Sequence, residues 1–417
     1  MKLSLFVRRA VFYCCCCIAL FLPFDFSLEN LGLTIPAIKS FFALEVVILI
    51  ILWEIAILSN RENVPNGGGL VYPFIVFLGI HLFSSVIPSE KMIWSLKYTA
   101  RFFGLGIVAF AIINFITSER RLERLISCVF AGACIASVFV AAQYFRHDAI
   151  DGLRRFFESA EVSSHRICGL FGWPTNMSVF FGALVPLAAC FWIFRPHSSV
   201  FRRAVYGSLT VLFIFCAVLS GTKGWLIGLF FAFACFVAIF AVQYRKPKII
   251  ALFFLLCGII VSAFLFNLFG FRSFTTGTLE PTEKIRLEYA KSALRSIQEY
   301  PFRGQGADMF FWKNVPRFRT HNIFLETTVN LGFFGLLALL WLYGAVMRKL
   351  YKGIRASDGF GQTYITLGIL CSLAGFLGHG LVDYFWSQSE IAGLFWVLVG
   401  AGVASTACEQ RSAEEGK

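Results

Sequence analysis

The sequence predicts an all-α polytopic membrane protein with about twelve transmembrane helices and a long outer loop that contains an amphipathic helix. Three observations support this fold class. The 417 residues are 58% hydrophobic and 17% aromatic, with a mean hydropathy of +0.74, far above the composition of a soluble globular chain. Apolar runs of bilayer length recur along the chain. One long polar segment, from Phe271 to His321, interrupts them.

The apolar runs provide the helix count. A bilayer core requires roughly 20 apolar residues per helix, and runs of this kind lie at residues 10–25, 41–58, 70–87, 97–117, 124–145, 176–194, 204–220, 223–243, 249–270, 323–347, 361–380 and 388–407. The expected organisation is helices 1 to 9 over residues 1–270 with an outer loop at about 147–175, a large outer loop over 271–322, helices 10 to 12 over 323–407, and an inner tail over 408–417.

Lysine and arginine residues orient the chain. With the N-terminus inside, the inner segments are rich in both residue types, whereas the short outer loops hold only Lys39, Lys91, Lys97 and Lys223. This asymmetry predicts that both termini lie on the inner side. The first apolar run lacks a small-residue cleavage site, so we expect a retained helix and not a signal peptide.

The sequence lacks the motifs of several kinds of cofactor and metal chemistry. Nearly all of the 13 cysteines lie in or beside apolar runs, so no disulfide framework is implied. The chain has no phosphate-binding glycine loop, no H-E-x-x-H and no paired-cysteine zinc spacing. We therefore expect no cofactor, no metal and no nucleic-acid partner.

The polar segment carries nine basic residues against five acidic ones, which predicts a cationic surface for an anionic substrate. Within it, residues 282–299 are predicted to form a helix, because Pro281 precedes them and Pro301 follows. Charged side chains gather on one face and apolar side chains on the other, but Arg286 falls in the middle of the apolar face. A buried guanidinium needs an anionic partner. A pyrophosphate, a lipid headgroup or the carboxylate of Asp383 would serve.

Further polar residues lie on the outer side. Lys223 occupies the tight turn of residues 220–225, which suits either an interfacial anchor or a phosphate contact. Arg166 precedes a glycine-containing loop-to-helix junction and is a candidate ligand contact. Asn176 lies at the start of the next run, where helix capping explains it.

His321 and Asn322 close the polar segment at the start of an apolar run. An imidazole titrates near neutral pH, so His321 suits a general base, although a histidine at a helix start also suits a satisfied interfacial residue. His379 and Asp383 form an ionisable pair near the outer end of a later run. Such a pair indicates either a functional site or helix pairing.

Three blocks of the chain together resemble the O-antigen ligase and polymerase superfamily of bacterial envelope glycosyltransferases. The blocks are Arg166 to Asn176; Ser220 to Trp225; and the segment from Arg286 through Pro301-Phe302-Arg303-Gly304-Gln305-Gly306 to His321-Asn322 and Gly332-x-x-Gly335. The most specific feature is His-Asn, followed by nine residues and then G-x-x-G. The resemblance covers residues from about Arg166 to Gly400, and the first five spans match only in hydropathy.

The resemblance implies a GT-C-like glycosyltransferase of the O-antigen ligase type in the bacterial inner membrane, with its active site facing the periplasm. Such a ligase transfers polysaccharide from undecaprenyl pyrophosphate to a sugar hydroxyl of lipid A core, without metal and with inversion. By motif position the catalytic residues are His321, Arg286 and Lys223, and the expected substrate-binding residues are Arg166, Asn322, Asn176 and Asp383. The family usually has arginine at the position of Lys223, and lysine loses the bidentate geometry.

Three alternatives stay open. An O-antigen or exopolysaccharide polymerase joins the same donor to another lipid-linked glycan, and a protein O-oligosaccharyltransferase uses it on a protein. A transporter of lipid-linked anionic substrates would also need many spans and basic residues. Inverted repeats would favour a transporter, and the sequence shows none.

Overall fold

A computed structural model describes residues 2–24, 40–59, 67–87, 89–146, 166–245, 281–313, 318–357 and 359–415. The regular secondary structure in these ranges consists of helices, without a strand, which confirms the all-α prediction. The helices are α1 (Lys2–Phe21), α2 (Phe41–Ser59), α3 (Val71–Val86), α4 (Met92–Phe115), α5 (Glu119–Phe145), α7 (Pro174–Phe194), α8 (Val200–Leu219), α9 (Gly224–Gln243), α12 (Pro281–Glu299), α13 (Met309–Lys313), α14 (Ile323–Arg355), α15 (Phe360–His379), the 3₁₀-helix η2 (Phe385–Ser387) and α16 (Ser389–Glu415).

Eight helices within the described ranges are long and apolar enough to cross a membrane, and they are α4, α5, α7, α8, α9, α14, α15 and α16. Helix α3 is a shorter apolar helix. The chain is therefore a multi-pass membrane protein. The expected run at residues 249–270 lies outside the described residues, so the total of twelve spans stays a prediction.

Several helices extend beyond the apolar runs that predicted them. Helix α4 begins at Met92 and α5 at Glu119, and α14 continues to Arg355. Hydropathy marks only the part of a helix that matches the bilayer, whereas the backbone hydrogen-bond ladder continues into polar residues beyond it.

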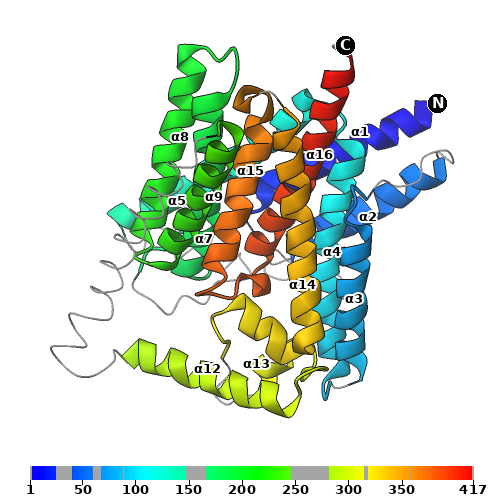
Figure 1. Ribbon diagram of the computed structural model, residues 1–417, viewed down its shortest axis with the longest axis vertical. Helices are drawn as coiled ribbons and strands as arrows, with labels where there is room; N and C mark the ends of the chain where they lie inside the picture. The colour runs from blue at the N-terminus through cyan, green and yellow to red at the C-terminus, as the bar shows by residue number, and fades with distance from the viewer. Residues whose placement is uncertain are drawn as a thin grey trace.

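The long helices run side by side, and α15 and α16 are the most enclosed of the candidate spans (Figure 1). Helix α15 packs against both α7 and α9. Its close approach to α9 depends on facing glycines, because a Cβ at Gly375 would lie 3.2 Å from the carbonyl oxygen of Gly228. The C-terminal end of α16 lies at the opposite end of the bundle from α12 (Figure 1).

Helix α12 confirms the predicted helix in the polar segment and lies across one end of the bundle (Figure 1). It packs through a narrow stripe in its C-terminal half, where Ala293 and Ile297 are buried against Phe310 and Val329. The remainder of the predicted apolar face is largely exposed, as shown by Ile285 (45%), Leu287 (46%) and Leu294 (53%).

Arg286 is exposed, so the prediction that it is buried in the apolar face of α12 is wrong. The helical wheel placed it correctly among apolar neighbours. However, α12 docks through its C-terminal half, and the surroundings of Arg286 do not pack against the bundle.

A break in α14 attaches the Pro301–Gly306 segment to the bundle. Gly332 has φ +71° and ψ −176°, which interrupts the helix. Backbone groups of α14 that are freed at this break hydrogen-bond to the segment. Phe333 N donates to the carbonyl of Pro301 (2.8 Å), and Gly306 N donates to the carbonyl of Asn330 (3.0 Å). A Cβ on Gly332 would lie 2.1 Å from the carbonyl oxygen of Phe302. The first glycine of the G-x-x-G motif therefore has a packing role.

We predict that Gly332→Ala lowers the free energy of unfolding by about 2 kcal/mol or more, because the methyl group collides with backbone and φ is positive. Gly344→Ala is the matched control on the same helix, since a Cβ there meets nothing within 4 Å; it should be neutral or stabilising by up to about 1 kcal/mol. Thermal unfolding in detergent compares the two. Equal melting temperatures would contradict the packing role.

Candidate active site

His321 and Asp383 meet at the end of the bundle that carries α12. The Nδ1 atom of His321 lies 3.3 Å from Oδ1 of Asp383, and the side chains are 40% and 15% exposed. The backbone of His321 has φ +51°, a left-handed conformation that is uncommon outside glycine and recurs at functional sites. The sequence separates these residues by 62 positions. Their contact is therefore a product of the tertiary fold.

Asn322 holds the two loops together. Its Oδ1 caps α14 by accepting hydrogen bonds from Phe324 N (3.0 Å) and Leu325 N (2.9 Å). Its Nδ2 donates to the carbonyl of Leu381 (2.9 Å), and the next residue, Ile323, donates its N–H to Gly380 O (2.8 Å). The side chain of Asn322 thus uses its acceptor and one donor to fix His321 against the loop that carries Asp383.

The carboxylate of Asp383 lies between two imidazoles. Oδ1 also accepts a hydrogen bond from Tyr384 N at 2.8 Å, and Oδ2 lies 3.6 Å from Nε2 of His379. Burial acts to raise the pKa of this carboxyl, but the contacts with His321 and His379 outweigh burial, so the pKa lies below its usual range. Asp383 is therefore an anion at neutral pH.

Lys223 lies on a turn that Arg166 holds in place. The guanidinium of Arg166 donates two hydrogen bonds to the carbonyl of Ser220, from Nη2 at 2.8 Å and Nε at 3.1 Å. The side chain of Lys223 is exposed at the N-terminus of α9. The next residue, Gly224, contacts His379, since a Cβ there would lie 2.7 Å from the ring's Cε1. The fold thus brings the turn of Lys223 to the same imidazole that Asp383 contacts.

A buried ion cluster lies beside these loops. Arg319 Nη1 lies 2.6 Å from Asp308 Oδ1 and 3.4 Å from Glu326 Oε1, and the carboxylates are 2% and 0% exposed. Burial acts to lower the pKa of Arg319, but the two carboxylates outweigh it, so the pKa lies above its usual range. Glu326 also accepts a hydrogen bond from Thr320 N (2.8 Å). The cluster therefore orders the backbone next to His321.

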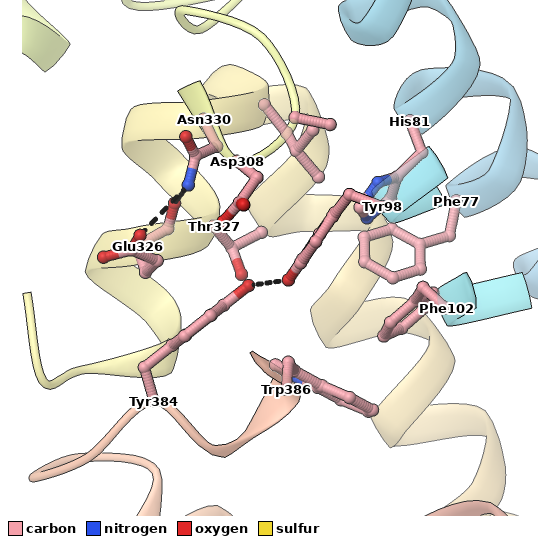
Figure 2. A pocket seen from close by; sticks show the side chains of 12 residues that line it. Phe77, His81, Tyr98, Phe102, Asp308, Glu326, Thr327, Asn330, Tyr384 and Trp386 are labelled. Carbon is pink, nitrogen blue, oxygen red and sulfur yellow. Dashed lines mark hydrogen bonds between the residues drawn. The ribbon is translucent and has the colours of Figure 1, made fainter. Parts of the chain in front are cut away.

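The cluster lines a small cavity of about 10 Å³, about the room that one water molecule needs (Figure 2). The phenol groups of Tyr98 and Tyr384 are hydrogen-bonded to each other across it. Trp94 Nε1 donates to Asp308 Oδ2 at 3.1 Å. Helix α4 thus supports both the ion cluster and the residue that follows Asp383.

Arg319 is one of the nine basic residues that predicted a cationic surface, but its side chain instead pairs with two buried carboxylates. The signal that could have identified it is Glu326, an acidic residue in the first turn of an apolar helix, which requires a cationic partner.

The expected cap at Asn176 is also wrong. The N-cap position falls on Trp173, and Pro174 occupies the first turn, where its fixed φ suits a helix start. Asn176 instead lies inside α7, is buried, and its Nδ2 lies 3.4 Å from Oε1 of Glu390. Its role in substrate binding, like those of Arg166, Asn322 and Asp383, stays a prediction.

The family model of the O-antigen ligases matches residues 208–340. Through this segment the chain is similar to the O-antigen ligase family, which supports the resemblance seen in the sequence motifs. The matched range contains Lys223, Arg286 and His321, whereas Arg166 and Asp383 lie outside it. A search of curated proteins finds no match to the chain.

We predict that Arg319→Met destabilises the protein by about 3 to 5 kcal/mol, because it leaves two buried carboxylates without their cation. Arg295→Met, at an exposed position of α12, is the control and should change the free energy of unfolding by less than about 0.5 kcal/mol. Thermal unfolding of the purified variants measures both. A destabilisation of similar size in the two variants would argue against the buried cluster.

Proposed function

We propose that this chain is an O-antigen ligase, which transfers a polysaccharide from undecaprenyl pyrophosphate to a sugar hydroxyl of lipid A core. The transfer takes place on the outer face of the bacterial inner membrane and requires no metal. The observation that carries the proposal is the contact between Asp383 and His321. His321 lies in the segment matched by the family model, which also contains Lys223 and Arg286.

His321 is the proposed base. The carboxylate of Asp383 is ionised and accepts hydrogen bonds only, so Nδ1 of His321 donates to it and Nε2 keeps the lone pair. The acceptor hydroxyl passes its proton to Nε2 as its oxygen attacks the anomeric carbon. The bond from that carbon to the phosphate oxygen breaks, and undecaprenyl pyrophosphate leaves with the electron pair. A single displacement of this kind inverts the anomeric configuration.

Lys223 and Arg286 are the proposed cations for the leaving pyrophosphate. Both side chains are exposed, so an incoming lipid-linked substrate can reach them. The two cations differ in how their backbone is held. Lys223 lies on a turn that Arg166 binds through two hydrogen bonds, whereas Arg286 lies in the half of α12 that does not pack on the bundle. Cations at the phosphate stabilise the charge that develops as the bond breaks.

A deletion strain tests the reaction. Loss of the whole polysaccharide ladder of lipopolysaccharide, with rough core retained and polymerised undecaprenyl-linked glycan accumulating, supports a ligase. A single-repeat band instead indicates a polymerase, and an unchanged ladder contradicts both.

In the same strain, we predict that His321→Ala fails to restore the ladder, because transfer falls by at least about 10²-fold without the base. Membrane levels of the variant, measured by immunoblot, should match wild type, since His321 is only half-buried. A normal ladder from this variant would contradict the assignment of the base.

For Arg286 we predict that lysine restores the ladder less well than arginine, because an ammonium lacks the planar fork that binds two phosphate oxygens. The matched control is Lys284→Ala, which removes an exposed cation from the same helix and should leave the ladder intact. If Arg286→Lys and wild type give equal ladders, Arg286 is a general surface cation and not a phosphate ligand.

A further inference from the structure

His379 is a buried histidine that the proposed reaction does not yet use. It is 3% exposed, and among the described residues neither of its ring nitrogens has a hydrogen-bond partner within normal distance. Oδ2 of Asp383 lies 3.6 Å from its Nε2. Burying imidazole nitrogens without hydrogen-bond partners costs desolvation free energy. A histidine kept at such a position therefore suggests a functional role.

The position of His379 is tightly determined. It ends α15, and its ring fills the space left by the missing side chain of Gly224, at the start of α9. Ser178 and Gly182 of α7 and Trp225 of α9 line a small cavity of about 10 Å³ beside the ring. The Nδ1 edge of the ring faces Gly224, whereas Nε2 lies toward Asp383.

Asp383 faces both histidines. The elements packed around them also carry Lys223, which precedes Gly224; Arg319, which is paired with Asp308 and Glu326; and Glu390, whose Oε1 lies 3.4 Å from Asn176 Nδ2. Among the described residues, Asp383 is the anion that lies within 4 Å of both imidazoles. An interaction between His379 and this carboxylate therefore weakens the attraction of the carboxylate for a protonated His321.

We propose that His379 is a positioning residue: it shares the carboxylate of Asp383 with His321 and so keeps His321 in the neutral form that accepts a proton. The inference rests on the proposed function for its catalytic meaning. The electrostatic effect of His379 on His321 follows from the positions of the two imidazoles and the carboxylate. A neutral His379 donates a hydrogen from Nε2 toward Oδ2, and a protonated His379 offsets the charge of the carboxylate. Both states weaken the attraction of Asp383 for a protonated His321.

The sign of the effect can be tested with two variants. His379→Leu removes the donor, so the undivided carboxylate favours protonated His321, and His321 loses its proton at higher pH. His379→Gln keeps an N–H donor near the position of Nε2 and should restore the wild-type behaviour. Asp383→Asn should shift His321 in the opposite direction, because the anion is gone.

The measurement is the rate at which diethyl pyrocarbonate modifies His321, followed by mass spectrometry of its peptide as a function of pH. The reagent attacks neutral imidazole, and the ring of His321 is accessible, whereas His379 is buried. For His379→Leu we expect the midpoint to rise by about 0.5 pH unit or more, with the glutamine variant at the wild-type midpoint. A leucine variant that is folded, by its thermal transition, and has the wild-type midpoint overturns the proposal. So does an equal shift in both variants.

A second apolar variant and a transfer assay complete the test. If His379→Leu does not fold, His379→Met takes its place, since the flexible side chain adapts to the space. Transfer from an undecaprenyl-pyrophosphate-linked glycan to rough lipopolysaccharide should lose activity at higher pH in the apolar variant than in wild type. A wild-type protein without transfer activity contradicts the proposed function, and the modification midpoints then still decide whether His379 shares the carboxylate.

Discussion

The carboxylate of Asp383 is the group on which the candidate site depends. A buried anion is costly unless donors surround it. Here the backbone N–H of Tyr384 and Nδ1 of His321 lie at hydrogen-bond distance from the carboxylate, and Nε2 of His379 lies 3.6 Å from it. These contacts connect the loop after α15, the loop before α14 and the last residue of α15. Asn322 strengthens the same connection through the cap of α14 and its bond to Leu381.

A second buried set of charges supports this arrangement from behind. Arg319 lies between Asp308 and Glu326 and stacks over the ring of Tyr384. Its cluster reaches α4 through Trp94 and the pair of tyrosines. The loop with His321 and the loop with Asp383 are thus both attached to a buried ion cluster, while His321 itself stays accessible. Accessibility combined with a fixed ring suits a base that must meet a large lipid-linked substrate.

The polar segment contains two kinds of cation. Arg319 points inward, where two carboxylates neutralise it, whereas Arg286 is exposed on the half of α12 that does not pack. An uncompensated cation is the one that can bind a pyrophosphate, so burial separates structural charges from those available to substrate. Lys223 belongs with Arg286, and its turn is held by the guanidinium of Arg166.

The sequence alone determined that this is a helical membrane protein, that residues 282–299 form a helix, and that His321, Lys223 and Arg286 are candidates for the chemistry. The first two conclusions depend on local composition and periodicity, which survive in any tertiary arrangement. The three candidate residues follow from motif positions in the family resemblance. Only the tertiary structure decided that Asp383 lies beside His321 and His379, that Arg319 pairs with two buried carboxylates, and that Arg286 and Asn176 are not placed as expected. Burial and ion pairing depend on which helices pack together, and that information is spread over residues far apart in the chain.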